Sequence, residues 1–190
     1  MMKGESMDRF KFTEVPGNIF DYEPYYRLAH CISSDFCGFR SRLSVQINNK
    51  YNIYEELKKS YPREAWRGRG YCIYCAGIFN LVARFRANEV MRSNRLREAL
   101  EDMRDQMIKY EIKKAVLPRI EEGNVVWNDG SDDCVHNLIT LVFAGTDLEI
   151  KVVYPPQTKE DLSIIDPDLE RIHFGEDRKH IDGNTERKYY

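Results

Sequence analysis

The segment LAHCISSDFCGFRSRL, residues 28–43, joins an apolar run to a polar loop. Ser33, Ser34 and Asp35 follow the apolar run directly. Open α/β sheets present such groups to nucleotides, because their ligands bind beyond the carboxyl ends of the strands. The segment therefore predicts an α/β fold with a ligand-contacting edge at residues 33–35.

The second half of this segment differs from a typical phosphate-binding loop. Such loops favour glycines, because residues without a side chain let backbone N–H groups approach the phosphate. Here a single glycine, Gly38, lies among bulkier residues that include Arg40 and Arg42. Gly38 would let its backbone approach a phosphate, and the guanidinium forks of Arg40 and Arg42 suit phosphate oxygens. Gly38, Arg40 and Arg42 are therefore candidate ligand-binding residues.

Apolar spacing around the segment predicts strands that alternate with helices. Strands are expected at residues 9–15, 26–32, 70–75, 114–120 and 147–154, and helices at 42–60, 93–113 and about 135–142. The clearest helix is the one at 93–113, with an expected buried side of Leu96, Leu100, Met103, Met107 and Tyr110. Such alternation requires a sheet covered on both faces.

Length and composition limit the class of protein. The chain has 190 residues, of which 42% are hydrophobic, so it can bury one sizeable core. Its longest apolar runs, such as LITLVF at 138–143, are far shorter than the ~20 residues that a membrane span needs. The five cysteines follow no framework spacing, which favours reduced thiols and a cytoplasmic or nuclear location. We expect a monomer without membrane contact, with one domain at 1–154 and a polar, partly ordered extension at 155–190.

Charge is distributed unevenly along the chain. Residues 58–97 contain ten lysines and arginines against two glutamates, whereas residues 121–149 contain seven acidic residues and no lysine or arginine. The basic segment could contact RNA weakly, although scattered charge more often marks a solvated helix face.

Four segments together resemble a macro domain of the terminal ADP-ribose protein glycohydrolase type. They are FTEVPGNIFDYEPYYRLAHCIS, LREALEDM, LPRI and VFAGTDLEIKVVY, and the resemblance spans roughly residues 10–154. It implies a three-layer α/β/α fold, in which a mixed central sheet has helices on both faces. It also implies a cleft for ADP-ribose, or for an ADP-ribosylated protein, at the ends of the strands.

The resemblance implies an adenine contact after the first strand. The family has a Gly-Asp pair there, and this chain has Gly17 and Asn18, followed by Ile19. The amide oxygen of Asn18 can accept the hydrogen bond from the adenine amino group, but without the assistance of a negative charge.

The resemblance also implies a diphosphate contact at the end of LPRI and just after it, at Arg119, Ile120 and Gly123. The family has Gly-Cys-Gly at a position where this chain has Glu121, Glu122 and Gly123. The two carboxylates oppose a diphosphate unless their side chains point away from it.

Catalysis in the glycohydrolase branch uses a lysine after the central strand and an aspartate after the Gly-Cys-Gly loop. The lysine position falls near Ile78, and the sequence contains no lysine between Lys59 and Lys109. The aspartate position falls near Val125, with Asp129 as the nearest candidate. The resemblance thus implies that one catalytic group is missing and the other displaced.

The sequence indicates neither a metal site nor a cofactor. Cys72 and Cys75 form an isolated C-x-x-C, and residues three apart on a strand face opposite sides. We therefore expect a macro-type recognition module without catalysis, which binds ADP-ribose or a related adenine nucleotide weakly or has moved to a protein partner. The alternatives are an ADP-ribosyl glycohydrolase with relocated groups and an RNA-contacting module.

Overall fold

The computed structural model describes residues 10–36, 41–60, 68–127 and 134–157. In this part of the chain a six-stranded sheet has the order β1-β8-β6-β2-β4-β3. Its strands are β1 (Lys11–Pro16), β2 (Arg27–Ser33), β3 (Tyr71–Cys75), β4 (Ile78–Arg84), β6 (Lys114–Pro118) and β8 (Glu149–Tyr154). All neighbours are parallel except β3, which runs antiparallel to β4. The short strands β5 (Met91–Arg92) and β7 (Val125–Val126) form a separate parallel pair.

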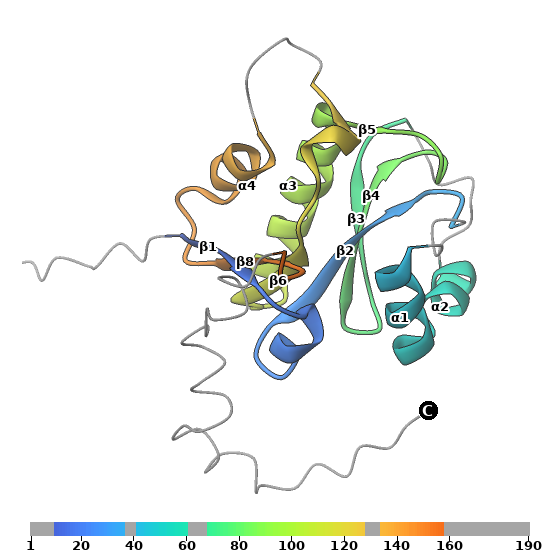
Figure 1. Ribbon diagram of the computed structural model, residues 1–190, viewed down its shortest axis with the longest axis horizontal. Coiled ribbons are helices and arrows are strands. Elements are labelled where there is room, and N and C mark those ends of the chain that lie inside the picture. Colours follow the sequence, from blue (N-terminus) through green and yellow to red (C-terminus); the bar gives the residue numbers. More distant parts are fainter. Residues whose placement is uncertain (1–9, 37–40, 61–67, 128–133, 158–190) are drawn as a thin grey trace, which may run out of the picture.

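Helices cover both faces of this mixed sheet (Figure 1). The helices α1 (Arg42–Tyr51) and α2 (Ile53–Ser60) lie on one face, and α3 (Ser93–Lys109) and α4 (Val135–Phe143) lie on the other. Two short 3-10 turns, η1 (Ile19–Tyr22) and η3 (Glu122–Asn124), follow β1 and β6. The expected three-layer α/β/α architecture is confirmed.

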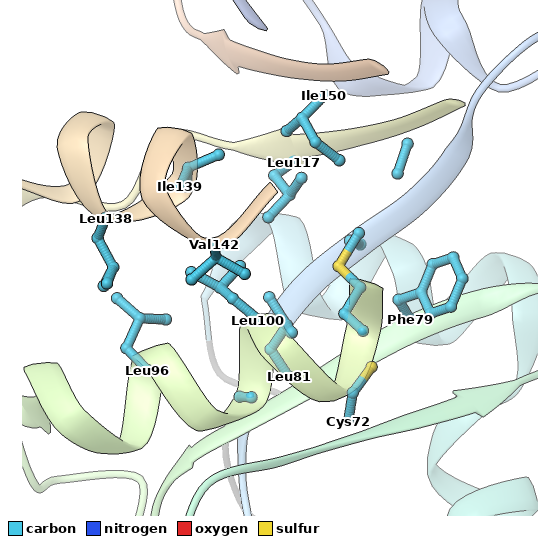
Figure 2. Close-up of a cluster of buried hydrophobic side chains, with 14 of the residues drawn as sticks. Cys72, Phe79, Leu81, Leu96, Leu100, Leu117, Leu138, Ile139, Val142 and Ile150 are labelled. Carbon is cyan, nitrogen blue, oxygen red and sulfur yellow. The ribbon is translucent and has the colours of Figure 1, made fainter. Parts of the chain in front are cut away.

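A hydrophobic core fills the space between the sheet and helices α3 and α4 (Figure 2). Helix α3 contributes Leu96, Leu100, Met103 and Met107, and α4 contributes Leu138, Ile139 and Val142. They pack on sheet residues such as Leu81, Leu117 and Ile150. Full burial of such side chains stabilises the fold by roughly 1.5–3 kcal/mol each.

The core on the opposite face contains a buried lysine. Ile47, Ile53 and Leu57 of α1 and α2 pack against the sheet there. The side chain of Lys151 on β8 is only 1% exposed, and its Nζ lies 4.9 Å from the centroid of the Tyr22 ring. A cation over an aromatic ring is stabilised by the ring quadrupole, which favours this buried arrangement.

Helix α3 is shorter than the sequence pattern predicts, and Tyr110 is not in its buried row. The helix ends at Lys109, because Glu111 adopts a left-handed conformation with φ of 56°. The N–H of Ile112 donates to the Met107 carbonyl at 2.8 Å and the N–H of Glu111 to the Ile108 carbonyl at 3.2 Å. This pair of bonds is a Schellman motif, which turns the chain and leaves Tyr110 49% exposed.

The predicted strand at 70–75 is the outer arm of a hairpin. Ala76 and Gly77 connect β3 to β4 with positive φ values of 48° and 79°, as two-residue hairpin turns require. The strand beside β2 is therefore β4, which ends at Arg84. Ile78 begins β4, so the segment that follows this strand starts at Phe85 instead of near Ile78.

Several sequence predictions lie outside the described residues. They concern Gly38 and Arg40 in the altered loop, Asp129 as candidate acid or base, and residues 158–190 of the extension. No helix among the described residues is long and apolar enough to span a membrane.

Candidate functional site

A cavity of about 480 Å³ lies at the carboxyl edge of the parallel strands. Four segments line it: the turn after β1, the first turns of α1, the segment after β6 and the end of β8. The lining residues are Gly17, Asn18, Ile19, Arg42, Leu43, Gln46, Pro118, Arg119, Glu121, Val153, Pro155 and Pro156. The carboxyl edge of an open α/β sheet is where ligands generally bind.

Backbone hydrogen bonds hold these segments together. The N–H of Gly17 donates to the Tyr154 carbonyl at 2.8 Å, and the N–H of Arg119 donates to the Val153 carbonyl at 2.9 Å. Gly17 has a φ of 154°, a conformation that other residues rarely adopt. The cavity is therefore built on an extension of the β1-β8-β6 ladder, and Gly17 is required for its first turn.

Asn18 starts the 3-10 turn η1. Its backbone is extended, and its side-chain Oδ1 accepts a hydrogen bond from the N–H of Phe20 at 3.2 Å. Asparagine commonly satisfies the first N–H groups of a helical turn in this way. The oxygen that the sequence assigns to an adenine amino group thus already accepts a backbone hydrogen bond.

The cavity contains two positive groups and one negative group. Arg42 and Arg119 are both exposed, and the Arg119 guanidinium lies 5.2 Å from the centroid of the Tyr154 ring. The third charged residue of the lining is Glu121. Two guanidinium forks can bind phosphate oxygens, whereas the carboxylate repels them.

Glu122 points away from this cavity. Its Oε1 accepts the N–H of Val135 at 2.8 Å, so it satisfies the first turn of α4. Glu122 and Ile120 line a second cavity of about 370 Å³ beside α4. Gly123 is exposed in η3 and lines neither cavity.

Ser33, Ser34 and Asp35 lie at the carboxyl end of β2, but they do not line the 480 Å³ cavity. Ser33 is fully buried and its hydroxyl donates to the Asp35 carboxylate at 2.6 Å. The hydroxyl of Ser34, which is 2% exposed, donates to the Phe85 carbonyl at 3.0 Å. The Ser34 hydroxyl thus holds the turn after β2 against the residue that follows β4, whereas the Ser33 hydroxyl bonds within the turn itself.

His30 and Cys31 belong to the interior of the sheet. The His30 Nε2 lies 2.8 Å from Oδ1 of buried Asn80, and burial lowers the pKa of His30 to about 4. Burial likewise raises the pKa of the Cys31 thiol to about 11. A neutral imidazole and a protonated thiol are typical of structural residues in a core.

Cys72 and Cys75 face opposite sides of β3, as their spacing predicts. Cys72 is part of the core beneath α3, and Cys75 packs against the core beneath α1 and α2. Among the described residues no group of three or more metal-ligating side chains gathers.

Two basic side chains of the segment at 58–97 pair with neighbouring acidic side chains in the part that the structure describes. Lys58 pairs with Glu55 at 3.5 Å, and Lys59 pairs with Glu56 at 3.1 Å. The Nε of Arg84 is buried and has no hydrogen-bond partner among the described residues. Both ion pairs lie on α2 and are typical of a solvated helix face.

Solved macrodomains are similar to this structure over most of its length. The macrodomain of Thermus aquaticus DarG matches with a TM-score of 0.56 and 16% identity, over 77% of this chain and 99% of that one. The macrodomain of Mycobacterium tuberculosis DarG matches with a TM-score of 0.55 and 16% identity, over 77% and 98%. The chain has the macrodomain fold.

A third solved structure is Thermosipho africanus DarTG in complex with ADP-ribose. It matches with a TM-score of 0.53 and 13% identity, over 84% of this chain and 44% of that one. No protein-family model matches the sequence, and no curated protein matches it significantly.

Sequence reasoning missed part of the 480 Å³ cavity. Leu43 and Gln46 line it because they lie in the first turns of α1, and Pro155 and Pro156 line it because β8 ends there. The sequence contained a signal for Leu43 and Gln46. Arg42 was selected as a binding residue, and these two lie one and four positions after it, in the first turns of the same helix. The prolines gave no such signal, because only the fold brings the end of β8 beside α1.

Proposed function

We propose that this macrodomain is a recognition module that binds ADP-ribose, or a related adenine nucleotide, weakly and without hydrolysing ADP-ribosyl linkages. The observation that supports it is the composition of one cavity. Gly17, Asn18, Ile19, Arg42 and Arg119 were selected from the sequence for ligand binding, and all five line the 480 Å³ cavity.

The lining of the cavity suits a nucleoside diphosphate in polarity and charge. Ile19, Leu43 and Val153 provide apolar walls for a base, and Arg42 and Arg119 provide donors for phosphate oxygens. Glu121 offsets part of this attraction, because two like charges a few ångströms apart repel by ~1 kcal/mol or more in wet surroundings. Weak affinity follows from this opposition.

The lysine that catalysis in the glycohydrolase branch requires has no counterpart after β4. The segment after β4 reads FRANEV at 85–90 and contains no lysine. Lys151, which lies in the sheet, is only 1% exposed and lies over the Tyr22 ring, so it is unavailable to a substrate. Formation of a covalent adduct requires an accessible amine beside a carboxylate.

Calorimetric titration of the full chain with ADP-ribose tests the binding proposal. We expect a dissociation constant of about 10 μM or weaker. Arg119→Gln should weaken binding further, whereas the control Arg97→Gln, which changes an exposed arginine on α3 outside the cavity, should leave it unchanged. Nanomolar binding would contradict weak recognition, and no binding by any variant would favour a protein partner instead.

A hydrolase assay on mono-ADP-ribosylated protein tests the second half of the proposal. We expect no release of ADP-ribose above the rate of a denatured sample. Release by the wild type that disappears in Asp129→Ala would establish the alternative, an ADP-ribosyl glycohydrolase with relocated groups.

A further inference from the structure

The lining of the 480 Å³ cavity attracts negative charge. Its two cations, Arg42 and Arg119, are both exposed, and neither forms an ion pair with a described residue. Helix α1 begins at Arg42 without an acidic residue in its first turn, so nothing there offsets the partial positive charge of its N-terminus. Glu121 is the one carboxylate of the lining and opposes only part of this attraction. The cavity therefore favours an anionic occupant.

The chain itself continues from the wall of this cavity. Pro155 and Pro156 follow β8 directly and line the cavity. Proline restricts φ to about −65°, so the chain leaves this wall along a restricted path. The segment 160–170 begins four positions after Pro156. It is thus tethered to the cavity by a very short connection.

The segment 160–170, EDLSIIDPDLE, has the composition that the cavity favours. It contains five acidic residues and no lysine, arginine or histidine. Its four leucines and isoleucines suit the apolar walls formed by Ile19, Leu43 and Val153. Residues 171–190 instead contain four acidic residues against five lysines and arginines. Charge complementarity thus selects the segment 160–170 from the residues that follow the cavity.

We propose that residues 160–170 dock in the 480 Å³ cavity of their own chain, pair with Arg42 and Arg119, and compete there with a nucleoside diphosphate. A short tether gives such a segment an effective concentration in the millimolar range. Contacts that are too weak to join separate molecules are then sufficient to occupy the cavity for much of the time. The competition rests on the proposed function, whereas the docking does not.

Trypsin cleavage after Arg171 tests the docking in the full chain, without any nucleotide. A docked segment protects this bond, because the protease requires several accessible residues on each side of it. Cleavage follows the population of the open form when opening and closing are fast. Arg42→Gln combined with Arg119→Gln should therefore raise the cleavage rate about two- to ten-fold, as expected for the loss of two exposed ion pairs.

The matched control for cleavage is Arg92→Gln combined with Arg97→Gln. It removes two exposed arginines outside the cavity, so the cleavage rate should not change. The same rate in the wild type and in the variant of Arg42 and Arg119 would overturn the docking. Protection that rises with protein concentration would place the segment in the cavity of a second copy, and would overturn the contact within one chain.

Calorimetric titration of the full chain with ADP-ribose tests the competition. The segment variant carries Asp166→Asn, Asp168→Asn and Glu170→Gln, which remove charge and keep the shape of each side chain. Its affinity should be about two- to ten-fold higher than that of the wild type, because the segment no longer occupies the cavity.

The control for affinity carries Glu176→Gln, Asp177→Asn and Asp182→Asn. It changes the net charge by the same amount, outside the segment 160–170, and should bind ADP-ribose as the wild type does. Equal tightening in both variants would assign the effect to net charge and overturn the competition. Unchanged cleavage together with unchanged affinity would overturn the whole inference and leave the proposed function standing. Faster cleavage without ADP-ribose binding by any variant would overturn the proposed function and leave the docking standing.

Discussion

The carboxylate of Asp102, on helix α3, accepts the backbone N–H of Cys72, on strand β3, at 2.7 Å. β3 is the edge strand of the sheet, so its outer backbone groups have no neighbouring strand. Two further residues of the same helix face act similarly, because Glu98 accepts the N–H of Gly70 at 2.6 Å and Gln106 donates to the Cys72 carbonyl at 2.8 Å. Side chains spaced by four residues on α3 thus replace a strand and cover an edge that could otherwise pair with another chain.

Asp102→Ala should destabilise the fold, because the buried N–H of Cys72 would lose its acceptor. We expect a loss of about 1–3 kcal/mol in the free energy of unfolding, measured by urea denaturation. Asp105→Ala is the matched control on the same helix, since its carboxylate is exposed and bonds to the neighbouring Arg104. The control should change stability by less than about 0.5 kcal/mol. Equal effects of the two substitutions would contradict the role of Asp102.

Gly70→Ala should be strongly destabilising, because α3 passes directly over this residue. A Cβ at Gly70 would lie 1.8 Å from the carbonyl oxygen of Arg95, which is backbone and cannot turn away. Overpacking of this kind typically costs about 1–3 kcal/mol or more. Gly123→Ala is the control, since a Cβ there meets nothing within 4 Å. A fall in the thermal midpoint for Gly70→Ala alone is the expected result, and an unchanged midpoint would show that α3 can shift.

Acid should weaken the fold through His30. Its pKa is lowered to about 4 in the folded protein, from 6.5, so the unfolded chain binds a proton over a range of pH in which the folded protein does not. The full stability is present above about pH 6.5 and is lost as the pH falls toward 4, by about 3 kcal/mol in total from this group. His30→Gln should remove this part of the pH dependence of the unfolding free energy.

The control for His30 is His136→Gln, because His136 is exposed beside Glu14 and is not part of the sheet interior. This substitution should leave the loss of stability between pH 6.5 and 4 almost unchanged. The same loss in His30→Gln as in the wild type would assign the acid sensitivity to other groups.

The two neighbouring glutamates after β6 should have separable effects. Glu121 lines the 480 Å³ cavity, so Glu121→Gln should tighten ADP-ribose binding about two- to five-fold by removing one repulsive charge. Glu122 bonds to the N–H of Val135 instead, so Glu122→Gln should leave affinity unchanged and lower stability by about 0.5–1 kcal/mol. Calorimetry and urea denaturation measure the two effects, and a larger gain in affinity from Glu122→Gln would show that the assignment is reversed.

The layers of the fold could be predicted from the sequence, since the apolar period of each element is a local property. The row from Leu96 to Met107 indicated a helix and its buried side, and α3 has both. The prediction of its last turn was wrong, because periodicity does not report the left-handed conformation of Glu111 that ends the helix. Gly17 and Asn18 were selected through the resemblance to macro domains, before their partners in the fold were known.

Which elements become neighbours was decided only by the tertiary structure. The sequence treated Glu121 and Glu122 as one acidic pair, but the folded chain turns the first toward the cavity and the second toward α4. Arg42 and Arg119 are 77 positions apart in the numbering and share a cavity only because α1 and the end of β6 meet at the same sheet edge. The physical reason is that periodicity reports which side of an element is buried, whereas side-chain direction and long-range contact depend on the packing of the whole sheet.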